Sequence, residues 1–575
     1  MAQNHQTPNH QTRNQRLEPV ENQLSLNMIP QNEKIRDDQV ENSTKGMVWQ
    51  VNDLNRLHRF LVLGSEQATY SIGKKELGME NAKAILRLFE AGRGLEVVNE
   101  ILTFSLEGRT AKQDSIMLAL AMCARLGDLP TKQRAYEVMP QICRIPTHLF
   151  MFVAQSKKLS HPTTGWGRAP RKAIQKWYNE KSPMKLAMAI TKYQKREGWS
   201  HADIARVTHP KSDNPVIQCV LKYAVRGFAE MSTAFPDSVQ NSEELNSVLS
   251  FFKAVEETKK LTMDNEDRVV ELIEGQQLVR EHIPTVCLGS KKVWDALLKK
   301  MPMTAMIRNL NKLTAIGLLE ENNEQVQLVC ENLRNEDLLK KARIHPFNVL
   351  LALKQYESGK SDKSGHSGRG DKVSLTWKAN PIITKALEDA FYLSFKNVEP
   401  TGKRHMLAMD VSGSMQCGGC VGSPSIQPRV ASAAMAMVTA RTERDHKFVA
   451  FSDTIVPMNI NSEMRLEEVL KATSSITMGS TDCAQPMFYA QRNKMEIDVF
   501  VVYTDCETWF GSVHPSEALK QYRIHSGVRD AKLIVVGMTS NGFTIADPED
   551  PGMFDMAGFD SAAPQVMKEF ILGNL

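Results

Sequence analysis

The chain has 575 residues, of which 42% are hydrophobic and 24% are charged, and its formal net charge is +5. This is the composition of an ordinary globular protein with several domains, and it excludes a fibrous or wholly disordered chain. No run of about 18 apolar residues occurs, so no membrane contact is expected, and the polar N-terminus is not a signal peptide. The nine scattered cysteines favour reduced thiols, and therefore a cytoplasmic protein with a nuclear pool.

The chain divides into three parts by composition. Residues 1–45 are rich in Asn and Gln and have no apolar core, which predicts a disordered arm. Residues 46–399 have an almost entirely helical pattern, interrupted by a polar, glycine-rich insert at 358–371 that we expect to be flexible. The Gly-Lys-Ser in this insert is not a P-loop, because Lys354 stands where a P-loop requires glycine and no strand precedes it.

The helical part predicts many short paired helices separated by polar turns. Such a series favours an α-solenoid ring of HEAT-like repeats, although no exact repeat period is visible and an irregular helical domain stays open. The clearest predicted helices cover 113–125, 131–141, 146–158, 244–259, 266–281, 291–300 and 303–318.

Residues 400–575 alternate between strand and helix patterns. Alternation of this kind predicts an α/β doubly wound, Rossmann-like domain with a mostly parallel sheet between helices. Strands are predicted at 405–410, 447–452, 498–504 and 532–538. Helices are predicted at 428–442, 464–474, 484–494, 515–523 and 563–572.

Two of these predicted strands run directly into acidic residues. The first ends at Asp410, and Ser412 and Ser414 follow at alternate positions; the second is followed by Asp505. Thr481 lies in a turn between the two strands. Because the carboxyl ends of parallel strands share one crevice, we expect these five residues to meet and to form a cage of hard oxygen ligands suited to Mg²⁺.

This arrangement resembles the metal-ion-dependent adhesion site of von Willebrand factor A domains. In that family a ligand oxygen usually completes the coordination of the metal, so the resemblance implies a possible protein ligand. A vestigial site that binds no ion is the alternative. A zinc site at Cys417 and Cys420 is not expected, because no second ligand pair follows at suitable spacing.

Positive charge is concentrated in one helical region. Residues 157–211 contain thirteen Lys or Arg and three acidic residues, a net charge of +10, whereas residues 401–575 have a net charge of −5. A stretch with this much positive charge favours a polyanion such as RNA as a binding partner, although a basic surface that contacts only solvent is the alternative. Trp166, Trp177 and Trp199 could stack on bases, but for Trp177 and Trp199 we favour packing within the protein.

Two groups of cations stand out within this region. Arg168, Arg171 and Lys172 form one cluster, joined by Lys176. A helix that begins at Ser182-Pro183 would place Lys185, Lys192 and Arg196 on one stripe, beside a separate apolar face. We expect this stripe to face outward and to contact phosphates.

Several longer motifs resemble the Ro ribonucleoprotein family, and the resemblance covers nearly everything after the N-terminal arm. The motifs are Trp166–Ala169, Trp177–Lys181, Arg343–Phe347, Pro400–Arg404 and Gly537–Asp547.

Members of that family have a ring of HEAT-like repeats, the TROVE module, closed by an A-type domain. The resemblance implies binding of small noncoding Y RNAs on the outer face of the ring, at positions that correspond here to Lys192, Arg196 and His209. It also implies binding of the single-stranded 3′ ends of misfolded noncoding RNAs through a central hole, as part of RNA quality control. A monomer that is not an enzyme is expected.

Two other functions compete with this interpretation. The first is an intracellular adhesion-type scaffold that binds proteins through a Mg²⁺-dependent A domain, which can coexist with RNA binding. The second is a nuclease that uses Asp410 and Asp505, but a single ion held partly by hydroxyl groups is a poor two-metal design. Ser412 is not in a Gly-x-Ser-x-Gly motif, so a serine hydrolase is not expected.

Overall fold

The structure is a computed structural model that describes residues 28–64, 74–160, 166–232, 242–360, 375–395, 398–420, 423, 425–476 and 479–574. Most of the predicted insert at 358–371 lies outside these ranges, as do residues 1–27. In the part of the chain that is described, no helix is both long and apolar enough to cross a bilayer.

The first two thirds of the chain are helical, as predicted. The α-helices are α1 (Asp53–Leu63), α2 (Lys74–Glu90), α3 (Gly94–Glu107), α4 (Asp114–Leu126), α5 (Leu129–Ile142), α6 (Pro146–Lys158), α7 (Arg168–Asn179), α8 (Pro183–Lys192), α9 (His201–Thr208), α10 (Pro215–Arg226), α11 (Phe228–Ser232), α12 (Glu243–Thr258), α13 (Glu266–Gln276), α14 (Lys291–Leu298), α15 (Met303–Ala315), α16 (Glu324–Arg334), α17 (Glu336–Lys341), α18 (Pro346–Glu357) and α19 (Pro381–Leu393). Short 3₁₀ helices η2 (Met263–Asn265), η3 (Arg280–His282) and η4 (Thr285–Gly289) connect some of them.

Local sequence signals set the ends of these helices, as α10 illustrates. The side chain of Asn214 accepts hydrogen bonds from the N–H groups of Val216 and Ile217, and Pro215 occupies the first turn, where no N–H is needed. The helix stops at Gly227, whose φ of 82° is a backbone conformation that glycine adopts without strain.

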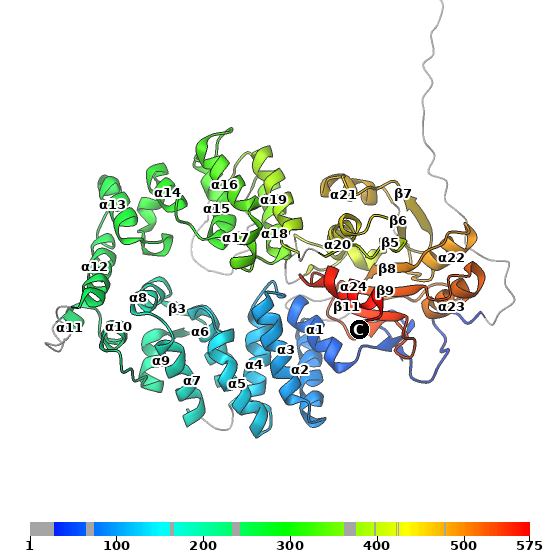
Figure 1. Ribbon diagram of the computed structural model, residues 1–575, viewed down its shortest axis with the longest axis horizontal. Helices are drawn as coiled ribbons and strands as arrows, with labels where there is room; N and C mark the ends of the chain where they lie inside the picture. Colours follow the sequence, from blue (N-terminus) through cyan, green and yellow to red (C-terminus); the bar gives the residue numbers. More distant parts are fainter. Residues whose placement is uncertain are drawn as a thin grey trace, which may run out of the picture.

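The helices form a ring that closes on itself. Figure 1 shows α1–α9 in one row, a turn through α10–α12, and a return row from α13 to α19. The first and last parts of the ring are joined by polar contacts: His345 Nε2 lies 3.0 Å from the carbonyl oxygen of Arg109, and Asn348 donates to the carbonyl of Ala111 at 3.0 Å. These bonds join residues more than 200 positions apart, so the helical part is a closed ring rather than an open rod.

The last third is a separate α/β domain with a six-stranded sheet. Its order is β11-β9-β8-β5-β6-β7, parallel except for β7, which pairs antiparallel with β6. The strands are β5 (His405–Asp410), β6 (His446–Phe451), β7 (Ile455–Met458), β8 (Val499–Thr504), β9 (Lys532–Gly537) and β11 (Met553–Ala557). The helices are η5 (Gly413–Gln416), α20 (Pro428–Thr442), α21 (Leu466–Ser474), α22 (Gln485–Arg492), α23 (Pro515–Ser526) and α24 (Ala563–Leu572).

Both faces of this sheet are covered, which explains why its central strands read as continuous apolar runs. Leu407 and Met409 of β5 belong to the same core as α20 and α24. Met406 and Ala408, which point the other way, belong to a second core with α22 and α23. The predicted fold class, a helical ring with a doubly wound A-type domain, is therefore confirmed.

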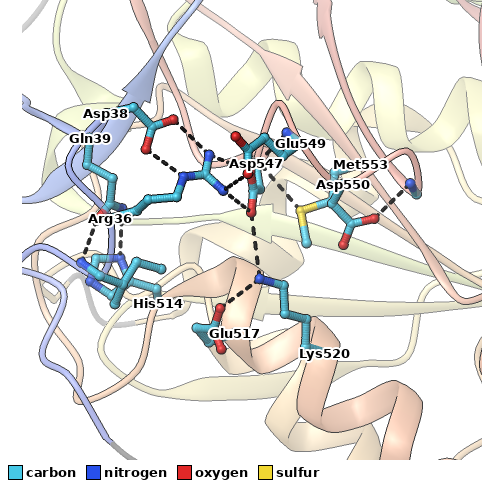
Figure 2. A network of polar contacts seen from close by, with 12 residues as sticks. Arg36, Asp38, Gln39, His514, Glu517, Lys520, Asp547, Glu549, Asp550 and Met553 are labelled. Atoms are coloured by element: carbon cyan, nitrogen blue, oxygen red, sulfur yellow. Dashed lines mark hydrogen bonds and ion pairs between the residues drawn. The ribbon is translucent and has the colours of Figure 1, made fainter.

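The prediction of a disordered arm over residues 1–45 is wrong for residues 28–45, which pack on the A domain. The guanidinium of Arg36 bonds to Asp38 at 2.6 Å and to Asp547 at 2.8 Å, and Lys520 approaches Asp547 from the other side at 3.7 Å (Figure 2). His514 Nε2 contacts the carbonyl of Glu33 at 2.8 Å. Asn- and Gln-rich sequence gave no sign of this, because the partners lie nearly 500 residues away.

A small sheet and a buried ion pair connect the start of the ring to the A domain. Strand β2 (Met47–Gln50) pairs with β1 (Val40–Glu41) on one side and with β10 (Phe543–Thr544) on the other. From α1, the fully buried guanidinium of Arg59 pairs with Asp555 of β11 and donates to the carbonyl of Phe543 at 2.9 Å. The two domains therefore share one interface.

Candidate nucleic-acid interface and metal centre

The five predicted oxygen ligands lie at the carboxyl edge of the sheet. Asp410 is the last residue of β5 and is fully buried. Its Oδ1 accepts from the N–H of Ser412 at 2.9 Å, and its Oδ2 accepts from the hydroxyl of Thr504 at 2.6 Å. The hydroxyls of Ser412 and Ser414 are 3.2 Å apart. The loop after β5 thus turns both serines toward the same point as the carboxylate.

Asp505 follows β8, the strand that pairs with β5, so the sheet register brings the two acids together. Burial raises the pKa of Asp410 to about 7, with a further contribution from the negative charge of Asp505. Burial also raises the pKa of Asp505, and a hydrogen bond from Ser414 partly offsets the effect. Neither carboxylate has a cationic partner among the residues described, so a divalent cation would relieve a repulsion that the protein leaves uncompensated.

Thr481 is buried at the same edge, and its backbone is held firmly. Its carbonyl oxygen accepts from the N–H groups of Trp509 and Phe510 at 3.2 and 3.1 Å, and from the hydroxyl of Thr508 at 3.2 Å. Two carboxylates and three hydroxyls without a soft ligand fit a hard cation such as Mg²⁺. The residues present therefore fit the ion that the sequence predicts.

The sequence interpretation missed residues around this site. Thr504 and the exposed aromatic pair Trp509 and Phe510 lie beside the predicted ligands. Asp482 follows Thr481 and accepts from the side chain of Gln31 at 2.6 Å; burial raises its pKa to about 6. Thr504 precedes Asp505 at a strand end and could have been found, whereas the contact to Gln31 has no local signal.

The first basic cluster lies on α7. Arg168, Arg171 and Lys172 are exposed on this helix and form no ion pair with other described residues. Lys176 is also exposed and approaches Glu180 at 3.5 Å. Pro170, Ala173, Ile174, Trp177 and Tyr178 are buried on the opposite side. The helix therefore presents free positive charge to solvent, as predicted.

The predicted helical stripe of Lys185, Lys192 and Arg196 is only partly correct. Lys185 is exposed on α8, and Lys192 is the last residue of that helix, 3.9 Å from Glu281. Arg196 is not helical: it lies on β3 (Lys195–Arg196), which pairs with β4 (Trp199–Ser200). The chain leaves the helix at Tyr193, so the three cations do not share one helical face.

The remaining predicted residues are a histidine and the tryptophans. His209 ends α9 with a left-handed φ of 47° and is exposed, immediately before Pro210. Trp177 is fully buried, and Trp199 packs edge to face on Trp166 with ring centroids 5.9 Å apart. The packing interpretation of Trp177 and Trp199 is therefore correct, and neither is a free stacking surface.

Comparison with known proteins agrees with this architecture. Residues 40–365 match the TROVE domain and residues 404–571 match the Ro60 vWA domain. "RNA-binding protein RO60" of Caenorhabditis elegans is 37% identical over 96% of this chain and 93% of its own length. The protein of the same name from Deinococcus radiodurans is 36% identical over 95% of this chain and 98% of its own.

A solved structure supports the same relationship. The crystal structure of the Deinococcus radiodurans RO (RSR) protein is 35% identical, covers 91% of this chain and 100% of its own, and has a TM-score of 0.65. The identities span both the ring and the A domain. The chain therefore belongs to the Ro60 family, whose members join a TROVE ring to a vWA domain.

Proposed function

We propose that this protein binds small noncoding Y RNAs through the basic outer surface of its ring. The observation that carries the proposal is the concentration of exposed cations on α7 and at Lys185 of α8 that form no ion pair with other described residues, in a chain whose relatives are named RNA-binding proteins. Arg168, Arg171 and Lys172 would contact phosphates, and Lys185 would extend the same field. Such contacts read the shape of an RNA helix and are sensitive to salt.

We further propose that the ring selects misfolded noncoding RNAs by their free 3′ ends. A closed ring admits a single strand more readily than a duplex, so an RNA whose end is unpaired can enter and a fully paired one cannot. The outer surface would then hold the structured part of the same RNA. Binding and sorting of RNA would need no catalysis, which agrees with the absence of a serine-hydrolase motif in the sequence.

The test removes the two cations that the family resemblance and the charge pattern both select. Lys192→Ala combined with Arg196→Ala should weaken Y RNA binding in a filter-binding assay and lower the salt dependence of log K by about one unit per lost phosphate contact. The control is Lys471→Ala combined with Arg492→Ala, which removes two exposed cations from the A domain and should leave the affinity unchanged. Equal affinities for the two double variants would contradict the proposal.

A second function is favoured by the metal centre. We propose that the A domain binds Mg²⁺ through Asp410, Ser412, Ser414, Thr481 and Asp505 and recruits a protein to the RNA complex. A bound Mg²⁺ would supply an open position for an oxygen atom of an acidic side chain of the partner. The rings of Trp509 and Phe510, each 41% exposed, offer apolar contact area beside that position.

A further inference from the structure

A cleft of about 420 Å³ lies between α8, α9, α10 and α12. Figure 1 shows these helices at the end of the ring far from the A domain. Its volume is within the range of about 300–1,000 Å³ that is typical of small-molecule sites. The wall includes aromatic and polar side chains, among them Phe228, Tyr223, Gln194 and Glu256. The predicted functional residues do not include any of them.

A two-stranded hairpin connects this cleft to the basic surface. Glu197 and Gly198 form its turn with φ values of 52° and 78°, the geometry that two-residue hairpin loops favour. Gln194 and Ser200, at the two ends of the hairpin, line the cleft. Arg196, beside the turn, is exposed to solvent. The hairpin therefore connects the wall of the cleft to an exposed cation.

Most polar groups in the cleft are already satisfied by the protein. The hydroxyl of Tyr223 donates to Glu256 Oε1 at 2.7 Å, and Lys259 bonds to the same oxygen at 2.6 Å. The Ser200 hydroxyl is engaged with Asp203 at 2.6 Å. The side-chain amide of Gln194 is different: it is exposed and has no hydrogen-bond partner among the residues described.

Two lysines lie near the cleft wall, and each has an acidic partner. His282 donates to, or accepts from, the hydroxyl of Thr191 in the cleft wall at 3.0 Å. Burial lowers the pKa of His282 to about 4, and the nearby ammonium groups of Lys192 and Lys259 lower it further. Both lysines therefore lie close to the same wall, and Lys259 also balances the charge of Glu256. Lys192 in turn lies 3.9 Å from Glu281, so the free cations nearest the cleft are the exposed Lys195 and Arg196 of the hairpin.

We propose that the cleft receives one unpaired nucleotide of the bound RNA. The base packs against the partly exposed ring of Phe228, the amide of Gln194 hydrogen-bonds to the base edge, and the flanking phosphates lie on Lys195 and Arg196. The inference rests on the proposed RNA-binding function and names the part of the RNA that these residues read. The cleft would bind an unpaired nucleotide, whereas α7, which has exposed cations but does not line this cleft, would contact only phosphates.

The test uses two RNA hairpins of equal length, one fully paired and one with a single bulged 2-aminopurine. The full chain should bind the bulged hairpin more tightly, on the order of tenfold, since stacking of a base on an aromatic ring is worth about 1–3 kcal/mol. The fluorescence of 2-aminopurine should fall on binding. Phe228→Ala and Gln194→Ala should each reduce the preference while the affinity for the paired hairpin stays the same.

Gln327→Ala is the matched control, because this glutamine is exposed on α16, away from the cleft, and should change neither affinity. Gln194→Ala keeps the test valid if Phe228→Ala misfolds, since Gln194 is on the surface. Equal binding of both hairpins by the unmodified chain would overturn the cleft proposal and leave the RNA-binding proposal intact. Binding of neither hairpin would count against both. Binding of free AMP as tightly as the bulged hairpin would make the cleft a small-molecule site and overturn the inference.

Discussion

At the scale of single residues, the candidate metal centre places two acids in one buried crevice. Burial and the charge of Asp505 raise the pKa of Asp410 to about 7. Near neutral pH, an ionised Asp410 therefore lowers the free energy of unfolding. Hydrogen bonds from Thr504 and Ser412 offset part of this cost. Without a cation, repulsion between the two carboxylates therefore destabilises the protein. Protonation or binding of a metal ion should relieve this repulsion and raise the stability.

This cost makes a prediction about pH. When folding raises the pKa of a carboxyl group, the free energy of unfolding falls as pH rises from the pKa of that group in the unfolded protein to its pKa in the folded protein. Stability without metal should therefore fall between about pH 4 and pH 7, by on the order of 4 kcal/mol for Asp410. Thermal melts in EDTA should show this loss, and Mg²⁺ should reverse it at pH 8.

Two variants complete this measurement. Asp410→Asn should abolish the response to Mg²⁺ and remove the part of the loss of stability that Asp410 causes, while the raised pKa values of Asp505 and Glu507 leave a smaller loss. Asp530→Asn, at an exposed position of the same domain, should retain both. If Asp410→Asn melts with the same dependence on pH and Mg²⁺ as the unmodified chain, the metal assignment is wrong.

The positions of the two acids could be predicted from the sequence because they lie at strand ends, and a buried strand is visible as an apolar run. Asp410 and Asp505 terminate two such runs, and parallel topology brings them together. The contact of Gln31 with Asp482 could not be predicted, because nothing near either residue identifies a partner about 450 positions away. Phe228 and Gln194 were missed for the same reason: a cleft depends on how four helices pack.

At the scale of secondary-structure elements, the A domain was easier to predict than the basic region. Strand β5 and helices α20 and α24 begin and end where predicted, because a buried strand and a helix with proline in its first turn have strong local patterns. The short strands β7, β10 and β11 were missed, since two to five residues rarely show a pattern of their own. The predicted helix through Arg196 was wrong because Glu197-Gly198 forms a hairpin turn, a signal only two residues long.

This hairpin can be tested by a single methyl group. Gly198 has a φ of 78° and nothing near its Cα to obstruct a side chain, so Gly198→Ala adds backbone strain of about 1–2 kcal/mol without a clash. RNA affinity in the filter-binding assay should fall, because the strain disfavours the turn that positions Lys195 and Arg196. Gly275→Ala is the control: it lies in α13 without a positive φ and should be neutral or stabilising, with RNA affinity unchanged. A normal affinity for Gly198→Ala would show that the hairpin geometry is unimportant.

At the scale of the whole molecule, the A domain contacts the ring where its first and last parts meet. The guanidinium of Arg109, between α3 and α4, pairs with Asp560, while Phe347 of α18 packs edge to face on Phe559 with centroids 5.3 Å apart. Both ends of the helical series therefore contact the same short segment after β11. The ring and the A domain should stabilise each other.

The buried pair of Arg59 and Asp555 tests this coupling. Asp555→Asn leaves a fully buried guanidinium without its counterion, which should cost about 3–5 kcal/mol. We expect the unmodified chain to unfold in one calorimetric transition and Asp555→Asn to show two, with the A domain and the ring unfolding separately. Glu96→Gln, which breaks the exposed pair with Arg93, should leave the transition unchanged. An unaltered transition in Asp555→Asn would contradict the coupling.

The central claim is that RNA binds the basic end of the ring and not the A domain. The most direct measurement is ultraviolet cross-linking of the full chain to a Y RNA, followed by mass spectrometry of the cross-linked peptides. We predict that these peptides come mainly from residues 166–211, where the exposed cations and the hairpin lie. Cross-links confined to residues 404–571, the Ro60 vWA domain, would contradict the account.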